Sequence, residues 1–220
     1  EMVVKTLEKN GVKVVFGYPG AANCPIIDKL SFSSIKHILT RNEQGAAHMA
    51  SGYARVTKQA GVCTATSGPG ATNLITGIAT AYMDSIPMVA LTGQVATKLI
   101  GKDAFQEVDI TGATLPFTKH SYLIKDGLDI PRVVNEAFHI ANTGRPGPVL
   151  IDFPMDLLKK EFDYPDEDED VNIRGYKLMG KANESQVKKV AEAIKGAKKP
   201  VILAGGGVVI SDATNEFRKF

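Results

Sequence analysis

Five short runs of mainly apolar, often β-branched residues recur between residue 12 and residue 153. They lie at 12–16, 35–39, 62–66, 88–92 and 149–153. Because most of these runs lack polar alternation, we expect strands that are covered on both faces. Helical patterns separate them, near 24–31, 43–57, 71–83 and 131–142. The sequence therefore predicts an α/β fold in which a parallel sheet is flanked by helices on both faces.

The alternating pattern stops after about residue 155. The segment 163–170 is an acidic run, whose self-repulsion favours an exposed linker over a cation site. A helical pattern at 185–194 and an apolar run at 200–204, which we expect to be a strand, then predict the beginning of a second α/β domain. We expect a first domain at 1–155, a linker at 156–182 and a truncated second domain at 183–220, because too few residues remain to close a second core.

Composition narrows the function only a little. The 220 residues are 44% hydrophobic and 23% charged, with a net charge of +2, so the chain reads as globular and lacks the charge of a nucleic-acid-binding or membrane-surface protein. Cys24 and Cys63 have no metal-ligand or disulfide spacing. With no apolar run long enough to cross a bilayer and no signal-peptide pattern, we expect a cytoplasmic protein without a membrane partner.

Glycine-rich turns follow several of the expected strands. They lie at 17–20, 67–70 and 93–94. In an open parallel sheet, ligands bind beyond the carboxyl ends of the strands, so these turns are expected to line one common edge. Glu43 follows a strand as well and belongs to the same edge.

Glu43 is the candidate catalytic residue. Asn42 is a good helix N-cap before it, and a stripe of alanines lets the helix pack closely against a neighbour: Ala46, Ala47, Ala50 and Ala54. A carboxylate held there with little water favours its protonated form and can share a proton with a ligand nitrogen. The alternative is that Glu43 only stabilises the helix dipole, by about 0.3–1 kcal/mol.

The turn 205–207 is a weaker signal. Three glycines after an apolar run could bind a dinucleotide, but the third glycine of the G-x-G-x-x-G pattern is missing. A non-catalytic nucleotide-binding module is therefore an alternative function for the chain.

Six motifs occur in order along the first 148 residues. They are Gly17-Tyr-Pro-Gly20, Arg41-Asn-Glu-Gln44, Ser67-Gly-Pro-Gly-Ala-Thr-Asn73, Gly93-Gln-Val95, Asp103-Ala-Phe-Gln-Glu107 and Gly144-Arg-Pro-Gly-Pro148. Together they resemble the thiamine-diphosphate enzymes, and among these the catalytic subunits of the acetolactate synthases. The resemblance implies a pyrimidine-binding domain in which Glu43 contacts a pyrimidine ring nitrogen of thiamine diphosphate. It also implies decarboxylation of pyruvate and condensation with a second 2-keto acid, pyruvate or 2-ketobutyrate, in branched-chain amino-acid biosynthesis.

The resemblance assigns further residues. Those next to thiamine diphosphate are Tyr18, Gly20, Ala21, Pro69, Asn73 and Gln106. It implies that Phe105 borders the substrate and that Arg145 contacts FAD, whose phosphate or flavin oxygens suit the fork of a guanidinium. Read without the resemblance, these residues could be turn, packing or surface residues.

Two departures and one absence limit the resemblance. Ala96 and Met155 stand where many relatives have a proline and a basic residue, so the shape of the substrate channel is not transferred. The Gly-Asp-Gly motif that binds Mg²⁺ and the diphosphate in this family does not occur, so we expect the chain alone to be inactive. The resemblance further implies a homodimer or tetramer and a possible regulatory small subunit. Other thiamine-diphosphate enzymes, such as pyruvate oxidase, glyoxylate carboligase, catabolic acetolactate synthase and oxalyl-CoA decarboxylase, are alternative parents.

Overall fold

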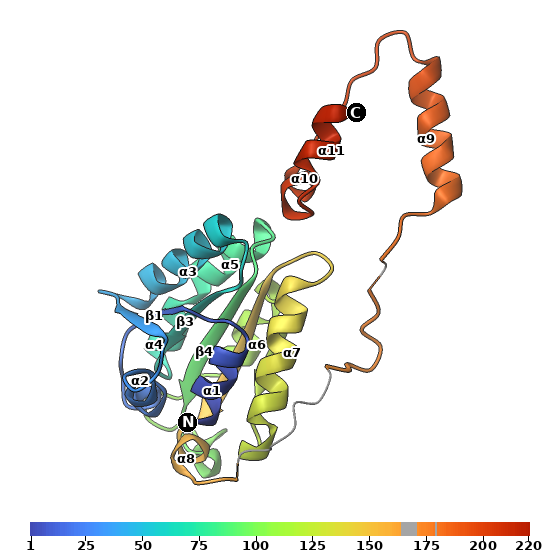
Figure 1. The fold of residues 1–220 in the computed structure, drawn as a ribbon. Helices are drawn as coiled ribbons and strands as arrows, with labels where there is room; N and C mark the ends of the chain where they lie inside the picture. Colours follow the sequence, from blue (N-terminus) through green and yellow to red (C-terminus); the bar gives the residue numbers. More distant parts are fainter. Residues whose placement is uncertain (164–170, 179) are drawn as a thin grey trace. The chain divides into compact units, whose positions relative to one another are not determined.

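The computed structural model describes residues 1–163, 171–178 and 180–220, and it divides into two compact units at Tyr176. Unit 1 covers residues 1–176 and unit 2 covers residues 177–220 (Figure 1). The acidic run 163–170, which the sequence identifies as a linker, lies outside the described residues except for Asp163. The first unit carries the candidate site.

Unit 1 is built on a parallel sheet of six strands in the order β2-β1-β3-β4-β6-β5. The strands are β1 Val14–Gly17, β2 Lys36–Leu39, β3 Gly61–Ala65, β4 Met88–Gln94, β5 His120–Leu123 and β6 Pro148–Pro154. All five strand pairs are parallel, which confirms the predicted α/β class and the five strands expected from sequence. The sequence reading missed β5, an edge strand that pairs with β6 and, among the described strands, with no other, and that has no fully buried residue.

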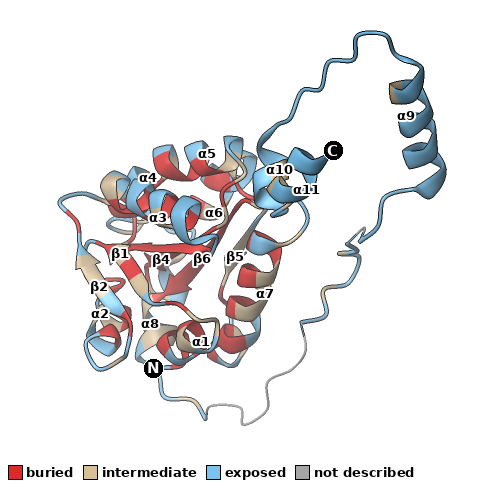
Figure 2. Ribbon diagram, turned by 45° about the horizontal axis from the view of Figure 1, so that its top comes forward, coloured by how far each residue is buried: buried red, intermediate tan, exposed pale blue. Residues whose placement is uncertain are grey.

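Helices cover both faces of this sheet (Figure 2). One face packs against α1 Met2–Lys9, α2 Cys24–Leu30 and α7 Ile130–Asn142, and the other against α3 Glu43–Thr57, α5 Ile75–Met83 and α6 Ile110–Thr114. Strand β4 shows the alternation: Val89 and Leu91 join the first core, whereas Met88 and Ala90 join the second. Central strands are buried throughout, and this explains why they read as continuous apolar runs.

Shorter elements connect these layers. They are α4 Pro69–Asn73, α8 Met155–Lys159, and the 3₁₀ turns Thr97–Leu99, Leu115–Phe117 and Gly127–Asp129. The predicted helix at 71–83 is two helices, α4 and α5, which meet at Leu74. The first of them begins directly at the Ser67–Gly70 turn, so the turn and the helix form one unit.

The alanine stripe of α3 packs against a glycine of α5. Ala47 is fully buried, and a Cβ atom added to Gly77 would lie 2.4 Å from the Ala47 Cβ. No larger side chain fits at either position without moving a helix. The close approach fixes the position of α3 and, with it, of Glu43 at its first turn.

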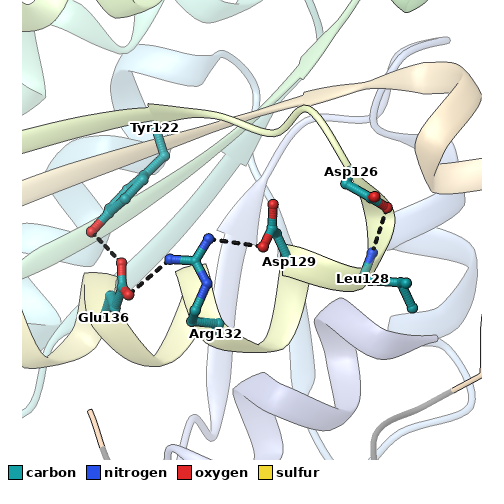
Figure 3. A network of polar contacts seen from close by, with 6 residues as sticks. All are labelled: Tyr122, Asp126, Leu128, Asp129, Arg132 and Glu136. Atoms are coloured by element: carbon teal, nitrogen blue, oxygen red, sulfur yellow. Dashed lines mark hydrogen bonds and ion pairs between the residues drawn. The ribbon is translucent and has the colours of Figure 1, made fainter. Parts of the chain in front are cut away.

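A polar network fastens the edge strand β5 to α7 (Figure 3). The Tyr122 hydroxyl donates to Glu136 at 2.8 Å, and Arg132 donates to Glu136 at 2.8 Å and to Asp129 at 2.9 Å. Burial raises the pKa of Tyr122, and the bond to Glu136 raises it further. The hydroxyl therefore stays protonated and acts as a donor.

One carboxylate lies deep in the sheet. Asp152 of β6 is 1% exposed, and its two oxygens accept hydrogen bonds from Thr92 at 2.7 Å and Gln94 at 2.8 Å. Burial raises the pKa of Asp152 from its ordinary value of 3.8 to about 7, although both hydrogen bonds act in the opposite direction. A weaker upward contribution comes from the charge of Asp109.

Part of the segment expected as a linker packs on unit 1. Phe162 lies against Gly127, where an added Cβ would be 2.1 Å from the phenyl ring. The Tyr176 hydroxyl lies 2.9 Å from Thr143 Oγ1 and accepts from Lys119 at 3.2 Å. The compact unit therefore ends later in the chain than the first-domain limit proposed from the sequence.

In unit 2, the predicted helix is present as α9 Glu184–Gly196, followed by α10 Gly206–Ile210 and α11 Thr214–Lys219. The run 200–204, predicted as a strand, is not one. Val201 and Leu203 are 94% and 97% exposed, and no described residue of 177–220 pairs with them. A strand needs a neighbour to satisfy its backbone groups, and the described part of the unit does not supply one.

Within the described ranges of both units, no helix is long and apolar enough to span a bilayer.

The contact between α3 and α5 predicts opposite effects for one chemical change at two helical glycines. Gly77→Ala should lower the free energy of unfolding by about 1–3 kcal/mol, because the new methyl group overpacks against Ala47. Gly52→Ala should leave stability unchanged or raise it by up to about 1 kcal/mol, because a Cβ there meets nothing within 4 Å and alanine favours helix. Urea denaturation of the 220-residue chain measures both. Equal effects of the two substitutions would contradict the packing.

The buried carboxylate predicts a pH-dependent difference in stability. The pKa of Asp152 is higher in the folded chain than in the unfolded chain, so ionisation costs the folded state progressively more as the pH rises from about 4 to about 7. Asp152→Asn removes this cost. The stability of the variant relative to the unchanged chain should therefore increase over that interval and level off above pH 7. Denaturation curves across pH test this, and a constant difference would contradict it.

Candidate functional site

The sheet has a topological switch point between β1 and β3. From β1 the chain moves to β2 at one edge and then returns to β3 on the other side of β1. Connections that leave neighbouring strands in opposite directions open a crevice at their carboxyl ends, where ligands bind in this type of sheet. The turns after β1 and β3 line this crevice, and α3 begins beside it. The expected common edge is therefore present.

Glu43 lies at this crevice. Asn42 caps α3 by accepting from the Gly45 amide at 2.8 Å, and Glu43 follows as the first helical residue. Its Oε2 accepts from the Asn73 side-chain amide at 2.9 Å, and its Oε1 lies 3.3 Å from the position where Gly70 would carry a Cβ. Two residues assigned to the same cofactor thus meet directly, and Pro69 begins the helix that carries Asn73.

The expectation of a water-poor Glu43 is not met within this chain. The side chain has intermediate exposure, and Asn73 is exposed. Its Oε1 lies next to Gly70, which has no side chain to cover it. The carboxylate is therefore accessible to a ligand placed in the crevice.

Thr66 is a residue of this site that the sequence reading did not select. It follows β3, and its hydroxyl accepts from the Ala22 amide at 3.1 Å. Added Cβ atoms would lie 2.5 Å from its side chain at Gly20 and 2.8 Å at Gly70. Thr66 therefore fills the space between the two turns. In the sequence, its only mark is its position at the end of an expected strand, directly before a glycine-rich turn.

The turn after β1 is shaped by Asn23, which the sequence reading also missed. This fully buried side chain accepts from the Gly20 amide at 2.8 Å and donates to the Tyr18 carbonyl at 3.1 Å. The backbone groups of the turn are thereby satisfied internally. Tyr18 is 43% exposed and Ala21 is exposed, so both side chains are available at the surface.

The loop that carries Phe105 and Gln106 lies against the turn after β3. Gly68 has a φ of +57°, and an added Cβ there would lie 2.5 Å from the Gln106 carbonyl oxygen. Glu107 stabilises the loop by accepting from the amides of Ala104, at 2.9 Å, and Gly101. These backbone hydrogen bonds lower the pKa of Glu107. Phe105 is 89% exposed.

Arg145 lies elsewhere. It precedes β6 and donates to Ser85 Oγ at 2.7 Å and to the Met83 carbonyl at 3.3 Å, just before β4 begins. In a parallel sheet, the amino ends of the strands are at the edge opposite their carboxyl ends. The structure therefore separates Arg145 from Glu43 and its neighbours.

The crevice offers one carboxylate, an amide and several glycine turns, and this set suits a flat, nitrogen-containing ring. Gly20 and Gly70 carry no side chain next to Thr66 and Glu43, and the Glu43 carboxylate can bond a ring nitrogen. Among residues 1–163, 171–178 and 180–220, no group of three or more His, Cys, Asp or Glu residues could hold a metal ion.

Comparison with known proteins agrees with this geometry. Residues 1–113 match the N-terminal TPP binding domain of thiamine pyrophosphate enzymes, and residues 187–220 match their central domain. The chain is 55% identical over 219 residues to a probable acetolactate synthase large subunit of Methanocaldococcus jannaschii, with 98% of this chain and 37% of the relative covered. It is 53% identical to an acetolactate synthase of Mycobacterium bovis over all of this chain and 35% of the relative.

A third relative is the acetolactate synthase large subunit of Buchnera aphidicola subsp. Schizaphis graminum, which is 52% identical over all of this chain and 39% of the relative. The chain spans a little over a third of the length of these relatives. With a thiamine pyrophosphate domain over half of its residues and homologues that are acetolactate synthase large subunits, the chain belongs to the thiamine pyrophosphate enzyme family.

Proposed function

We propose that this chain is part of an acetolactate synthase, which decarboxylates one 2-keto acid and joins the remaining fragment to a second one. The substrates would be pyruvate with pyruvate or with 2-ketobutyrate, in branched-chain amino-acid biosynthesis. The observation that carries the proposal is the Glu43–Asn73 pair at the switch-point crevice. More than half of the residues are identical to those of acetolactate synthases along nearly the whole chain, and this supports acetolactate synthesis over other thiamine-dependent reactions.

Glu43 is the residue that would exchange a proton with the cofactor. Its Oε1 would bond a pyrimidine ring nitrogen of thiamine diphosphate, while Asn73 holds Oε2 and fixes the orientation of the carboxylate. When bound, thiamine diphosphate supplies the electron sink for loss of carbon dioxide. The bound ring would also displace water from Glu43, and this would strengthen the hydrogen bond between its carboxyl group and the ring nitrogen.

The other assigned residues would bind and orient. The turns at the crevice contain Tyr18, Gly20, Ala21 and Pro69. The backbone of Gln106 lies against Gly68, in the second of these turns. Phe105, exposed at the same loop, would border the substrate. These roles rest on the family resemblance together with the placement of the loops.

Further partners follow from the same proposal. Mg²⁺ and the diphosphate would be held by residues outside this chain, which covers 35–39% of its relatives described above. FAD would bind at Arg145, and the active protein would be a homodimer or tetramer in the cytoplasm. The name "large subunit" of two relatives supports a small regulatory partner.

The central test is Glu43→Gln in the full-length protein. Glutamine keeps the shape and the bond to Asn73 but cannot release a proton, so acetolactate formation should fall at least about 100-fold. Secondary structure and thermal unfolding should be unchanged. Glu161→Gln, the same change at an exposed position, serves as the control and should retain full activity. Normal turnover of the Glu43 variant would refute its assignment, and a different product would indicate another thiamine-dependent reaction.

The assignment of Arg145 is tested by flavin content. Arg145→Ala should lower the affinity of the full-length protein for FAD about 10- to 100-fold, because charge-assisted hydrogen bonds are lost. Flavin absorbance of the purified protein after dialysis measures this. Arg55→Ala is the matched surface arginine, paired with Asp84 at 2.5 Å, and should keep its flavin. Equal flavin content in both variants would exclude Arg145 from the flavin site.

A further inference from the structure

The Gly93-Gln-Val95 motif has no role in the site described so far. Gln94, at the end of β4, is 4% exposed, and both polar atoms of its side chain form hydrogen bonds. Its Oε1 accepts from the Val95 amide at 2.8 Å, and its Nε2 donates to the Val108 carbonyl and to Asp152 Oδ2, each at 2.8 Å. A buried amide with this many partners has a single orientation.

Asp152 determines that orientation from within the sheet. It lies opposite Thr92 in the β4–β6 pair, and the Thr92 hydroxyl donates to its Oδ1 at 2.7 Å. Its Oδ2 then receives one of the two Nε2 hydrogens of Gln94, so the other hydrogen is directed at Val108. The contact with Val108 therefore depends on the acid.

Val108 ends the loop that carries Phe105 and Gln106. At the start of this loop, Asp156 accepts from the Thr97 amide at 2.8 Å. The hydrogen bonds of Glu107 come from the Gly101 and Ala104 amides of the loop itself, so they shape the loop without attaching it to the sheet. The bond from Gln94 attaches the Val108 carbonyl to the sheet, close to Gln106, and the Val108 side chain also packs against the second core.

We propose that Asp152 is a positioning residue, which acts through Gln94 to hold the 95–109 loop and its Phe105–Gln106 pair at the crevice. Its effect on catalysis rests on the function proposed above, whereas its effect on the loop does not. A leucine at this buried position would avoid the cost of burying a carboxyl group, so what the acid adds over an apolar side chain is its hydrogen bonds to Thr92 and Gln94. The raised pKa of Asp152 agrees with this cost.

Asparagine and alanine at position 152 separate positioning from packing. Asparagine can still accept from Gln94 through its oxygen, and its amide can donate to Thr92, whose hydroxyl can then turn toward the Ile151 carbonyl at 3.5 Å. Alanine offers neither contact. Asp152→Asn should therefore preserve the loop, and Asp152→Ala should release it.

The experiment is hydrogen–deuterium exchange of the full-length protein. In Asp152→Ala, exchange of peptides within 95–109 should rise about 10-fold or more, while peptides covering β3 at 61–65 stay protected. Asp152→Asn should exchange within about 2-fold of the unchanged protein. Thr6→Ala, which removes another buried side-chain hydrogen bond in α1, is the control and should not alter the loop.

Kinetics supply the second measurement. For Asp152→Ala, we expect the KM for pyruvate to rise about 10-fold with a smaller change in kcat, and Asp152→Asn should restore the KM. Unchanged exchange of the loop in Asp152→Ala would overturn the proposal. So would increased exchange throughout the protein, or an equal rise in KM in both variants. If the unchanged protein forms no acetolactate, the proposed function fails, and the exchange measurement alone decides the role of Asp152.

Discussion

Parallel pairing of β1 with both β2 and β3 is the constraint on which the rest of this structure depends. The chain crosses from β1 to β2 and then back to β3 on the other side of β1. The connections that follow β1 and β3 therefore lead away in opposite directions at the carboxyl edge of the sheet. Helix α3 must then begin at the same edge. The position of Glu43 is therefore a consequence of strand order, not of its local sequence alone.

Close packing fixes the side chains at that edge. Thr66 fills the space between the Gly20 and Gly70 turns, and the approach of Gly77 to Ala47 fixes α3 from behind. In both places, the absence of a side chain permits a contact that any other residue would block. The same small residues that leave Glu43 accessible also fix its surroundings, so stability and ligand access have one structural origin.

Sequence reasoning identified the parts of the fold that rest on local pattern. Strands β3, β4 and β6 are continuous apolar runs because helices cover both faces of the sheet there, and such runs can be recognised in the sequence. Strand β5 was missed because His120, Ser121 and Tyr122 form no apolar run, whereas the other edge strand, β2, was found through Ile35, Ile38 and Leu39. The run 200–204 was read as a strand because it is equally apolar, but pairing depends on a neighbour that the described part of unit 2 does not provide. At the site, motif order predicted Glu43, whose contact with Asn73 then appeared in the structure.

By itself, the sequence determined the α/β class, the order of the turns and the acid at the start of α3, since each depends on residues close together in the chain. Only the tertiary structure decided which of the assigned residues meet: Asn73 contacts Glu43, whereas Arg145 lies at the opposite edge of the sheet. It also decided the roles of Thr66, Gln94 and Asp152. Their hydrogen bonds to other segments join residues 14 to 60 positions apart, and no local pattern specifies contacts that exist only once the strands are paired.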